Sequence, residues 1–309
     1  MILVFGGTGF IGKNLLAALH ASGEQALAVS RNPDNEFLRL HAPSSRAMST
    51  VDFYRDPAAA LSECHAVVYL ASNSVPGSNL DEPWKELHDN IDPLMRLLAA
   101  VQECRPQSHM VFLSSGGTVY GRQDQPLIRE DMPLRPISAY GLGKKMMESA
   151  VTFMADQHGL KTTILRPGNP VGLWQKSHNQ GIVGVLMRAA ISGDEFPLLG
   201  DGSAIRDYFD VADLVTAIRL TIACPRKSVG EIFNVGSGTG LSVSRMLETV
   251  ERVSGRKIRI RMVAARSSDI DRVVLDTSHI RTRMEWQPQH KLEDTLTKIW
   301  SDIQGCADR

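Results

Sequence analysis

The chain has 309 residues, of which 43% are hydrophobic, and its 34 Lys and Arg residues balance its 34 Asp and Glu residues. This length suffices for one large α/β domain with a smaller second lobe and a core that needs no disulfides. The zero formal charge excludes a general electrostatic attraction to nucleic acid or to an anionic membrane surface.

The sequence also argues against a membrane segment, disulfides and a metal site. No apolar run approaches the length of a membrane span, and Ile2–Phe5 lacks the basic leader of a signal peptide. The histidines show no metal-binding spacing. The chain has no CxxC pair among its four cysteines, Cys64, Cys104, Cys224 and Cys306. We therefore expect reduced thiols, no bound metal and a cytoplasmic location.

Strands and helices are predicted to alternate through the first half of the chain. Short apolar runs predict strands at Met1–Phe5, Ala26–Val29, Ala66–Ala71, Met110–Ser114 and Thr162–Leu165. Apolar residues at helical spacing predict helices at Ile11–Ala21 and Trp84–Cys104. This alternation predicts an α/β fold with a doubly wound parallel sheet.

The pattern changes after Arg166, where loops lengthen and Gly, Pro, Asn and Gln become frequent. Residues Arg256–Val263 alternate strictly, which places Ile258, Ile260 and Met262 on one face of a predicted strand and basic residues on the other. The last third of the chain is therefore predicted to form a smaller lobe over the open edge of the sheet.

A glycine-rich loop lies between the first predicted strand and the first predicted helix. In Gly6-Gly7-Thr8-Gly9-Phe10-Ile11-Gly12, the glycines at 6, 9 and 12 suit a tight turn, a close approach to a pyrophosphate and close helix packing. We expect the backbone at Gly6, Gly9, Phe10, Ile11 and Gly12 to bind a dinucleotide at the start of the helix.

The residues after the second predicted strand bear on the choice between NAD and NADP. An acidic residue there would bind the ribose 2′-hydroxyl of NAD, whereas this chain has Ser30-Arg31-Asn32. Arg31 favours NADP because a guanidinium can bind a 2′-phosphate, but a surface arginine beside NAD is the alternative. Asp52 and Phe53 are predicted to contact the adenine.

Tyr140 and Lys144 are four residues apart and would share one face of a helix. A neighbouring ammonium lowers the pKa of a phenol, so we expect Tyr140 to act as a general base near neutral pH. Lys144 can also hold the nicotinamide ribose.

These motifs together resemble the extended short-chain dehydrogenase/reductase superfamily, which has a Rossmann sheet. Further motifs are similar to those of the UDP-galactose 4-epimerase branch of nucleotide-sugar epimerases and dehydratases: Ser114–Gly121, Asn169–Gly172, Gly200–Gly202, Arg206–Tyr208, Phe233–Gly238 and Trp286–Pro288. The resemblance covers nearly the whole chain.

The resemblance implies roles for further residues and a domain organisation. Leu70, Ala71 and Asn90 would contact the cofactor, Asn169 would contact the substrate, and Arg206 and Arg266 would bind the substrate diphosphate. It implies an NAD(P)-binding domain of residues 1–165 plus about 207–236. The nucleotide-sugar-binding lobe would comprise about 166–206 and 237–309. A homodimer formed through the helices Trp84–Cys104 and Tyr140–His158 is also implied, with Met146, Met147, Val151 and Met154 available for contact.

One position departs from the family pattern. The family places a catalytic Ser or Thr three residues before Val-Tyr-Gly, and that position is Gly116 here. Thr118 would share a face with it in an extended segment, whereas Ser115 would point to the other side. We therefore predict Thr118 as the catalytic hydroxyl and keep Ser115 as the second candidate.

Three functions fit the sequence. The resemblance favours a UDP-hexose 4-epimerase that oxidises C4 transiently and returns the hydride to the opposite face. Arg31 favours an NADPH-dependent reductase of a nucleotide-linked 4-keto-6-deoxy sugar. The glycine at position 116 leaves open a catalytically inactive NADP-binding sensor or partner-binding module, although such a protein has no need of Tyr140 or Lys144.

Overall fold

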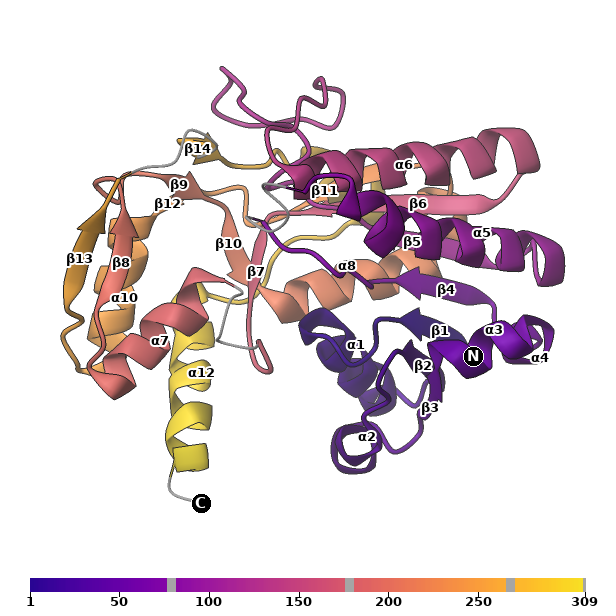
Figure 1. Cartoon of the computed structure of the whole chain (residues 1–309), viewed down its shortest axis with the longest axis horizontal. Helices are drawn as coiled ribbons and strands as arrows, with labels where there is room; N and C mark the ends of the chain where they lie inside the picture. The colour runs from indigo at the N-terminus through magenta and orange to yellow at the C-terminus, as the bar shows by residue number, and fades with distance from the viewer. Residues whose placement is uncertain (77–81, 176–180, 265–269, 308–309) are drawn as a thin grey trace.

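The computed structural model of the chain, which describes residues 1–76, 82–175, 181–264 and 270–307, is built around a seven-stranded parallel sheet (Figure 1). The strand order is β11-β6-β5-β4-β1-β2-β3. The strands are β1 (Ile2–Phe5), β2 (Ala26–Ser30), β3 (Arg46–Ser49), β4 (Ala66–Tyr69), β5 (His109–Leu113), β6 (Lys161–Pro167) and β11 (Ile232–Val235). The order reverses between β1 and β4, and ligands of such sheets bind at this point.

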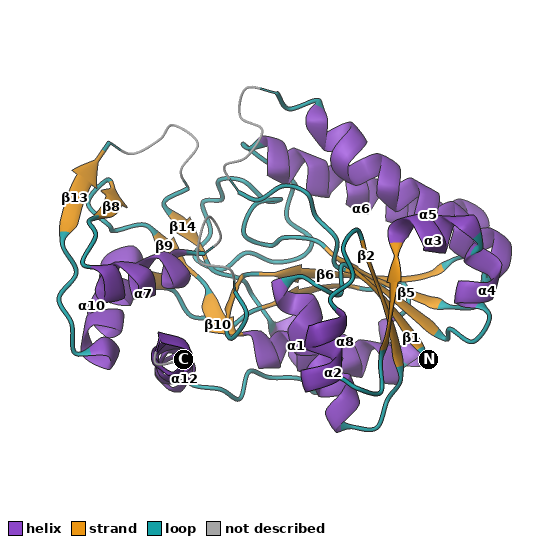
Figure 2. Cartoon of the chain, turned by 60° about the horizontal axis from the view of Figure 1, so that its bottom comes forward, coloured by secondary structure: helices purple, strands orange, loops and turns teal. Residues whose placement is uncertain are grey.

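Helices cover both faces of the sheet because the central strands are apolar on both sides (Figure 2). One face packs against α1 (Phe10–Ala21), α2 (Asn35–His41), α8 (Val211–Ala223) and α11 (Ser278–Met284). The other packs against α3 (Thr50–Arg55), α4 (Pro57–Leu61), α5 (Asp92–Cys104) and α6 (Ala139–His158). The predicted doubly wound α/β fold is confirmed.

Later segments form a smaller lobe with its own apolar core, beside the carboxyl ends of the strands (Figure 1). Its helices are α7 (Ile182–Ser192), α10 (Val243–Ser254) and α12 (Leu292–Ala307), while α9 (Pro225–Ser228) is a short turn after α8. Its strands form small sheets: β10 (Tyr208–Asp210) with β7 (Asn169–Val171), β13 (Ile260–Val263) with β8 (Phe196–Leu199), and β9 (Ile205–Arg206) between β12 (Leu241–Ser242) and β14 (Arg272–Val273).

Two predicted elements need correction. The helix expected over Trp84–Cys104 is interrupted, because Leu87–Ile91 form a π-helical turn, η1, and α5 begins only at Asp92. Pro93 lies in the first turn of α5, where its missing N–H costs no hydrogen bond. A π-helical turn of this kind often marks a functional site.

The strand predicted over Arg256–Val263 is shorter, and its apolar face is not buried. Only Ile258 is buried, while Ile260 and Met262 are 46% and 63% exposed. β13 pairs with β8 alone and lies at the outer edge of the lobe (Figure 1). The alternating pattern indicates which side chains share a face of the strand, but it does not show whether another element covers that face.

Two expected absences can be compared with the described residues. None of the helices there is both long enough and apolar enough to cross a membrane. The described cysteines Cys64, Cys104 and Cys224 are free thiols.

Candidate active site

A single large cavity runs along the carboxyl ends of the strands and into the lobe. Its volume is about 1800 Å³. Pockets for one drug-sized ligand usually have about 300–1,000 Å³, so this cavity has room for two ligands of that size. Its wall includes Gly6 and Arg31 at the sheet end, Tyr140 at the centre, and Asn169 and Arg206 from the lobe.

The glycine loop forms one end of the cavity, where backbone packing leaves no room for side chains. Gly6 has a φ of +86°, and a Cβ there would lie 2.7 Å from the nitrogen of Ala71. A Cβ at Gly12 would lie 2.4 Å from the Gly6 carbonyl oxygen. The predicted loop residues Gly6, Gly9, Phe10, Ile11 and Gly12 all line the cavity, and α1 begins at Phe10. The open amino end of α1 thus faces the cavity and suits a pyrophosphate.

Arg31 and Ser30 lie at the end of β2 on the cavity wall. Arg31 is exposed, and the hydroxyl of Ser30 is buried without a hydrogen-bond partner in the structure. No carboxylate follows β2 directly, although Asp34 lies on the wall and forms an ion pair with Lys13. Ser30 and Arg31, the two residues at this strand end that could contact the ribose, are therefore compatible with either NAD or NADP.

The adenine contacts predicted for Asp52 and Phe53 do not match the structure. Phe53 is completely buried in the core, with its ring edge on Phe5. Asp52 lies in α3, where it hydrogen-bonds Ser49 and pairs with Arg55. The helical turn of α3 instead directs Val51 and Tyr54 to the cavity wall.

Leu70, Ala71 and Asn90, the further residues predicted to contact the cofactor, line the cavity, and Leu70 and Ala71 pack against Gly6. Asn90 is buried, and its Oδ1 accepts a hydrogen bond of 2.8 Å from the Asn73 backbone nitrogen. Its Nδ2 donates to Glu86 Oε2 at 2.7 Å. Asn90 is thereby held in one orientation at the cavity wall.

Tyr140 and Lys144 lie on one face of α6, which Ser138 caps at its start and Gly159 ends in a left-handed conformation. Lys144 Nζ donates a 3.0 Å hydrogen bond to the Leu113 carbonyl and lies 5.8 Å from the Tyr140 ring centre. Burial lowers the pKa of Lys144 to about 8, against the opposing effect of the Glu148 and Glu86 carboxylates. The two side chains expected from the sequence are thus brought together.

The expected lowering of the tyrosine pKa is wrong for the ligand-free protein. Burial raises the pKa of Tyr140 to about 12, and a hydrogen bond with Ser115 opposes this rise. The sequence shows the nearby ammonium but not the burial, and burial is the largest effect on the pKa of Tyr140. A phenolate at Tyr140 therefore requires further positive charge or proton relay in the loaded site.

The structure also reverses the expected order of the two hydroxyls. Ser115 forms the hydrogen bond with Tyr140, whereas Thr118 Oγ1 is buried without a partner in the structure. The prediction assumed an extended chain, but the Thr118 and Val119 nitrogens both donate to the Ser115 carbonyl at 3.1 Å. This turn ends the alternation, so Ser115 faces the site.

Gly116 cannot hold a hydroxyl in this structure. A Cβ there would lie 2.7 Å from Leu275 Cδ1 and 2.9 Å from the Arg166 carbonyl oxygen. A Cβ at Gly117, by contrast, would meet only Asn169 and Ser115, each at 3.9 Å. Position 116, where the family has Ser or Thr, is therefore packed so closely by its neighbours that glycine fits and a side chain does not.

The substrate residues implied by the resemblance are only partly described. Asn169 and Arg206 line the lobe side of the cavity, and Asn169 Oδ1 is buried without a hydrogen-bond partner in the structure. Arg266 lies outside the described residues. Val273 is buried and does not line the cavity, whereas Ile270 does.

Two carboxylates that follow Arg206 closely in the sequence, Asp207 and Asp210, make defined hydrogen bonds. Asp207 accepts from the Ser237 nitrogen at 2.7 Å and from Leu275 at 3.2 Å. Asp210 caps α8 through Ala212. Both carboxylates hold the lobe against the sheet.

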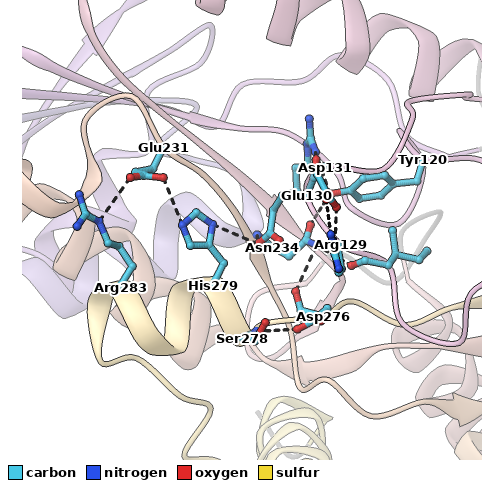
Figure 3. Close-up of polar contacts among 12 residues, drawn as sticks. Tyr120, Arg129, Glu130, Asp131, Glu231, Asn234, Asp276, Ser278, His279 and Arg283 are labelled. Carbon is cyan, nitrogen blue, oxygen red and sulfur yellow. Dashed lines mark hydrogen bonds and ion pairs between the residues drawn. The ribbon is translucent and has the colours of Figure 1, made fainter.

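A buried polar network behind Tyr140 was not foreseen. Arg166 Nη2 pairs with Glu148 Oε2 at 2.7 Å, and Glu148 also accepts from Ser114. Arg166 Nη1 donates to the Tyr120 hydroxyl at 2.9 Å, which in turn donates to Asn234. Figure 3 shows the network continuing through Glu130 to His279 and Glu231 at the surface. Its members lie far apart in the sequence, and only the helical spacing of Glu148 from Lys144 signals a shared face.

The described residues contain no group of three or more His, Cys, Asp or Glu side chains that could hold a metal ion.

Comparisons with known proteins show similarity to nucleotide-sugar epimerases and related enzymes over nearly the whole chain. Residues 2–236 match the family model described as "NAD dependent epimerase/dehydratase family". A UDP-glucose 4-epimerase of Lactobacillus helveticus is 29% identical, with 97% of this chain and 96% of that protein covered. A dTDP-4-dehydro-6-deoxyglucose reductase of Escherichia coli is 26% identical, with 98% and 97% covered. The crystal structure of a Thermotoga maritima UDP-glucose 4-epimerase with UDP-glucose has a TM-score of 0.90 at 26% identity and 99% coverage of both chains.

Proposed function

The chain belongs to the NAD-dependent epimerase/dehydratase family of enzymes, and from that premise we propose that it is a nucleotide-sugar 4-epimerase that acts on a UDP-hexose. The observation that carries the proposal is the joint placement of Tyr140, Ser115 and Lys144 on the wall of one cavity large enough for a dinucleotide and a nucleotide sugar. UDP-glucose 4-epimerases among the similar proteins support the choice of reaction.

The residues present fit NAD as the cofactor. The glycine loop gives backbone access without side-chain obstruction, and Asn90 and Lys144 are positioned on the wall beyond it. Bound there, NAD would supply a hydride acceptor for C4 of the sugar. In the proposed mechanism the Lys144 ammonium stabilises the Tyr140 phenolate, and Ser115 relays the proton from the sugar O4 to that phenolate, which becomes a phenol. After the 4-keto sugar has turned, Tyr140 returns the proton to O4.

Asn169 and Arg206 are proposed to hold the nucleotide diphosphate while the sugar turns. Arginine offers a planar pair of donors to phosphate oxygens, and the unpartnered Asn169 Oδ1 can accept from a sugar hydroxyl. A dehydratase would place an acid–base pair of side chains directly before Val119, and this chain has Gly117 and Thr118 at those positions. This absence favours epimerisation over elimination of water.

An NADPH-dependent reduction of a nucleotide-linked 4-keto sugar is the second candidate. Arg31 and the unpartnered Ser30 hydroxyl favour it, because they could bind a 2′-phosphate. The similarity to a dTDP-4-dehydro-6-deoxyglucose reductase also supports it.

The test is to release and identify any bound nucleotide, then to assay the purified protein on UDP-glucose and UDP-N-acetylglucosamine. We expect NAD to be retained and a 4-epimer to form without net change in NADH absorbance. A protein that binds NADPH much better than NADH and consumes it with a 4-keto sugar would instead establish the reductase.

Exchanging the two candidate hydroxyls separates their roles. We expect Ser115→Ala to lower kcat by roughly 10²-fold, because proton relay by a positioned group contributes about 10²–10⁴-fold. Thr118→Val should change kcat less than about threefold, since Ser115 and not Thr118 hydrogen-bonds Tyr140. Steady-state kinetics of both variants measure this, and equal losses in both would contradict the assignment.

The proposal includes the domain division 1–165 plus about 207–236 against about 166–206 plus 237–309, and a homodimer. β11 supports the division because it joins the sheet from late in the chain. Met147, Val151 and Met154 pack inward, which removes them from the expected interface. Exposed Leu142, Met146 and Phe153 on α6 instead support pairing with a second copy.

A further inference from the structure

A buried carboxylate, Glu86, lies directly behind the cavity wall at the start of η1. Glu86 is only 4% exposed. Its Oε2 accepts hydrogen bonds from Asn90 Nδ2 at 2.7 Å and from Ser74 Oγ at 2.9 Å. Ser74 and Asn90 line the cavity, and Asn90 also donates to Ser74 at 2.9 Å. Glu86 therefore holds two residues of the wall in position.

The same carboxylate packs against α6 between the two proposed catalytic side chains. A Cβ at Gly143 would lie 2.6 Å from Glu86 Oε2 and 3.2 Å from its Cβ. Gly143 directly precedes Lys144 and follows Tyr140 by three residues. Any larger residue at position 143 would displace the Glu86 carboxylate. Gly143 is therefore needed for the close contact between this carboxylate and α6, in addition to separating Tyr140 from Lys144 in the sequence.

The carboxylate acts on Lys144 through its charge. Burial disfavours the ammonium, and the two groups that oppose burial are Glu148 from α6 itself and Glu86 from the neighbouring η1. β5 contributes the Leu113 carbonyl, which accepts from Nζ, and the Phe112 ring, and neither titrates. The loop after β4 contributes Ser74, which is also neutral.

The two carboxylates differ in their surroundings. Glu148 pairs with the Arg166 guanidinium, whereas Glu86 accepts hydrogen bonds from Asn90 and Ser74. Tyr140 also senses Glu86, whose charge raises the pKa of the phenol. The Glu86 charge thus works on both members of the Tyr140–Lys144 pair.

We propose that Glu86 is a positioning residue of the Tyr140–Lys144 pair, which keeps Lys144 protonated and fixes Asn90 and Ser74 at the cavity wall. The proposal rests on the proposed function, in which the Lys144 ammonium stabilises the Tyr140 phenolate. Glu86 itself does not line the cavity and has no direct contact with the reacting atoms.

Glu86→Gln tests this because it removes the charge and keeps an oxygen acceptor of the same size. The readout is the NMR titration of ¹³C-labelled lysine side chains, with Lys144 assigned from Lys144→Met. Lys144 should titrate near pH 8 in the parent and about one pH unit lower in Glu86→Gln. The alkaline limb of the pH profile of kcat should move to lower pH by the same amount.

Two further variants complete the design. Gly143→Ala pushes the carboxylate away from α6, so it should move the Lys144 titration in the same direction. Glu82→Gln removes an exposed carboxylate paired with Lys85 on the same segment and should leave the titration unchanged. An unchanged Lys144 titration in folded Glu86→Gln and Gly143→Ala overturns the proposal. A shifted titration without epimerisation of any nucleotide sugar supports Glu86 and defeats the proposed function.

Discussion

Replacing Tyr140 with phenylalanine is expected to lower kcat by roughly 10³-fold, because it removes the proposed acid–base group and leaves the ring in place. The hydroxyl lies at the cavity wall and is bonded to Ser115, and in the proposed mechanism its loss removes the group that accepts the sugar proton. Lys144 keeps its hydrogen bond to Leu113 in this variant. Binding of NAD should therefore change little.

Single-turnover and steady-state kinetics on the active sugar measure the effect, with NAD affinity and thermal unfolding as controls. If Tyr140→Phe retains more than a tenth of the parental kcat while binding NAD normally, another residue is the base. A parallel loss of NAD binding would show that the phenol acts in cofactor binding rather than in proton transfer.

The largest effect on stability is expected for Glu148→Ala. This change leaves the Arg166 guanidinium buried, with its remaining hydrogen bonds to the Tyr120 hydroxyl and the Glu130 carbonyl. Breaking a buried ion pair from one side costs about 3–5 kcal/mol, because an uncompensated charge stays in the interior. We expect a loss of that size in the free energy of unfolding.

Urea unfolding followed by circular dichroism measures this loss. The matched comparison is the double variant Glu148→Met with Arg166→Met, since replacing both partners by apolar residues of similar size removes the unpaired charge. The double variant should be clearly more stable than Glu148→Ala. A loss below about 1 kcal/mol in Glu148→Ala would mean that Arg166 finds water or another partner.

Local patterns were sufficient to predict the parts of the site that depend on neighbouring residues. The glycine loop, the buried strands and the two ends of α6 follow from residues close in sequence, such as Ser138 and Gly159. The Tyr140–Lys144 spacing likewise required only helical geometry. These features match the structure because backbone conformation alone determines them.

Contacts between distant segments explain the rest. The turn that aims Ser115 at Tyr140 goes with close packing of Gly116 against Arg166 and Leu275. The pKa of Tyr140 depends on burial by several elements rather than on its lysine neighbour. Glutamates in helices are usually exposed, so nothing in the sequence indicates that Glu86 and Glu148 are buried. Only tertiary packing places them behind the cavity.

The late entry of β11 into the sheet has a consequence for biosynthesis. β11 pairs with β6 along Ile164–Pro167, so β6 has an open edge until the ribosome has also made α7, β8 and α8. At roughly 5–20 residues per second, this interval lasts several seconds. An unpaired apolar strand edge is a template for association with other chains. The β6 edge is therefore open to such association during synthesis, and the Rossmann sheet is completed only after part of the smaller lobe has been made.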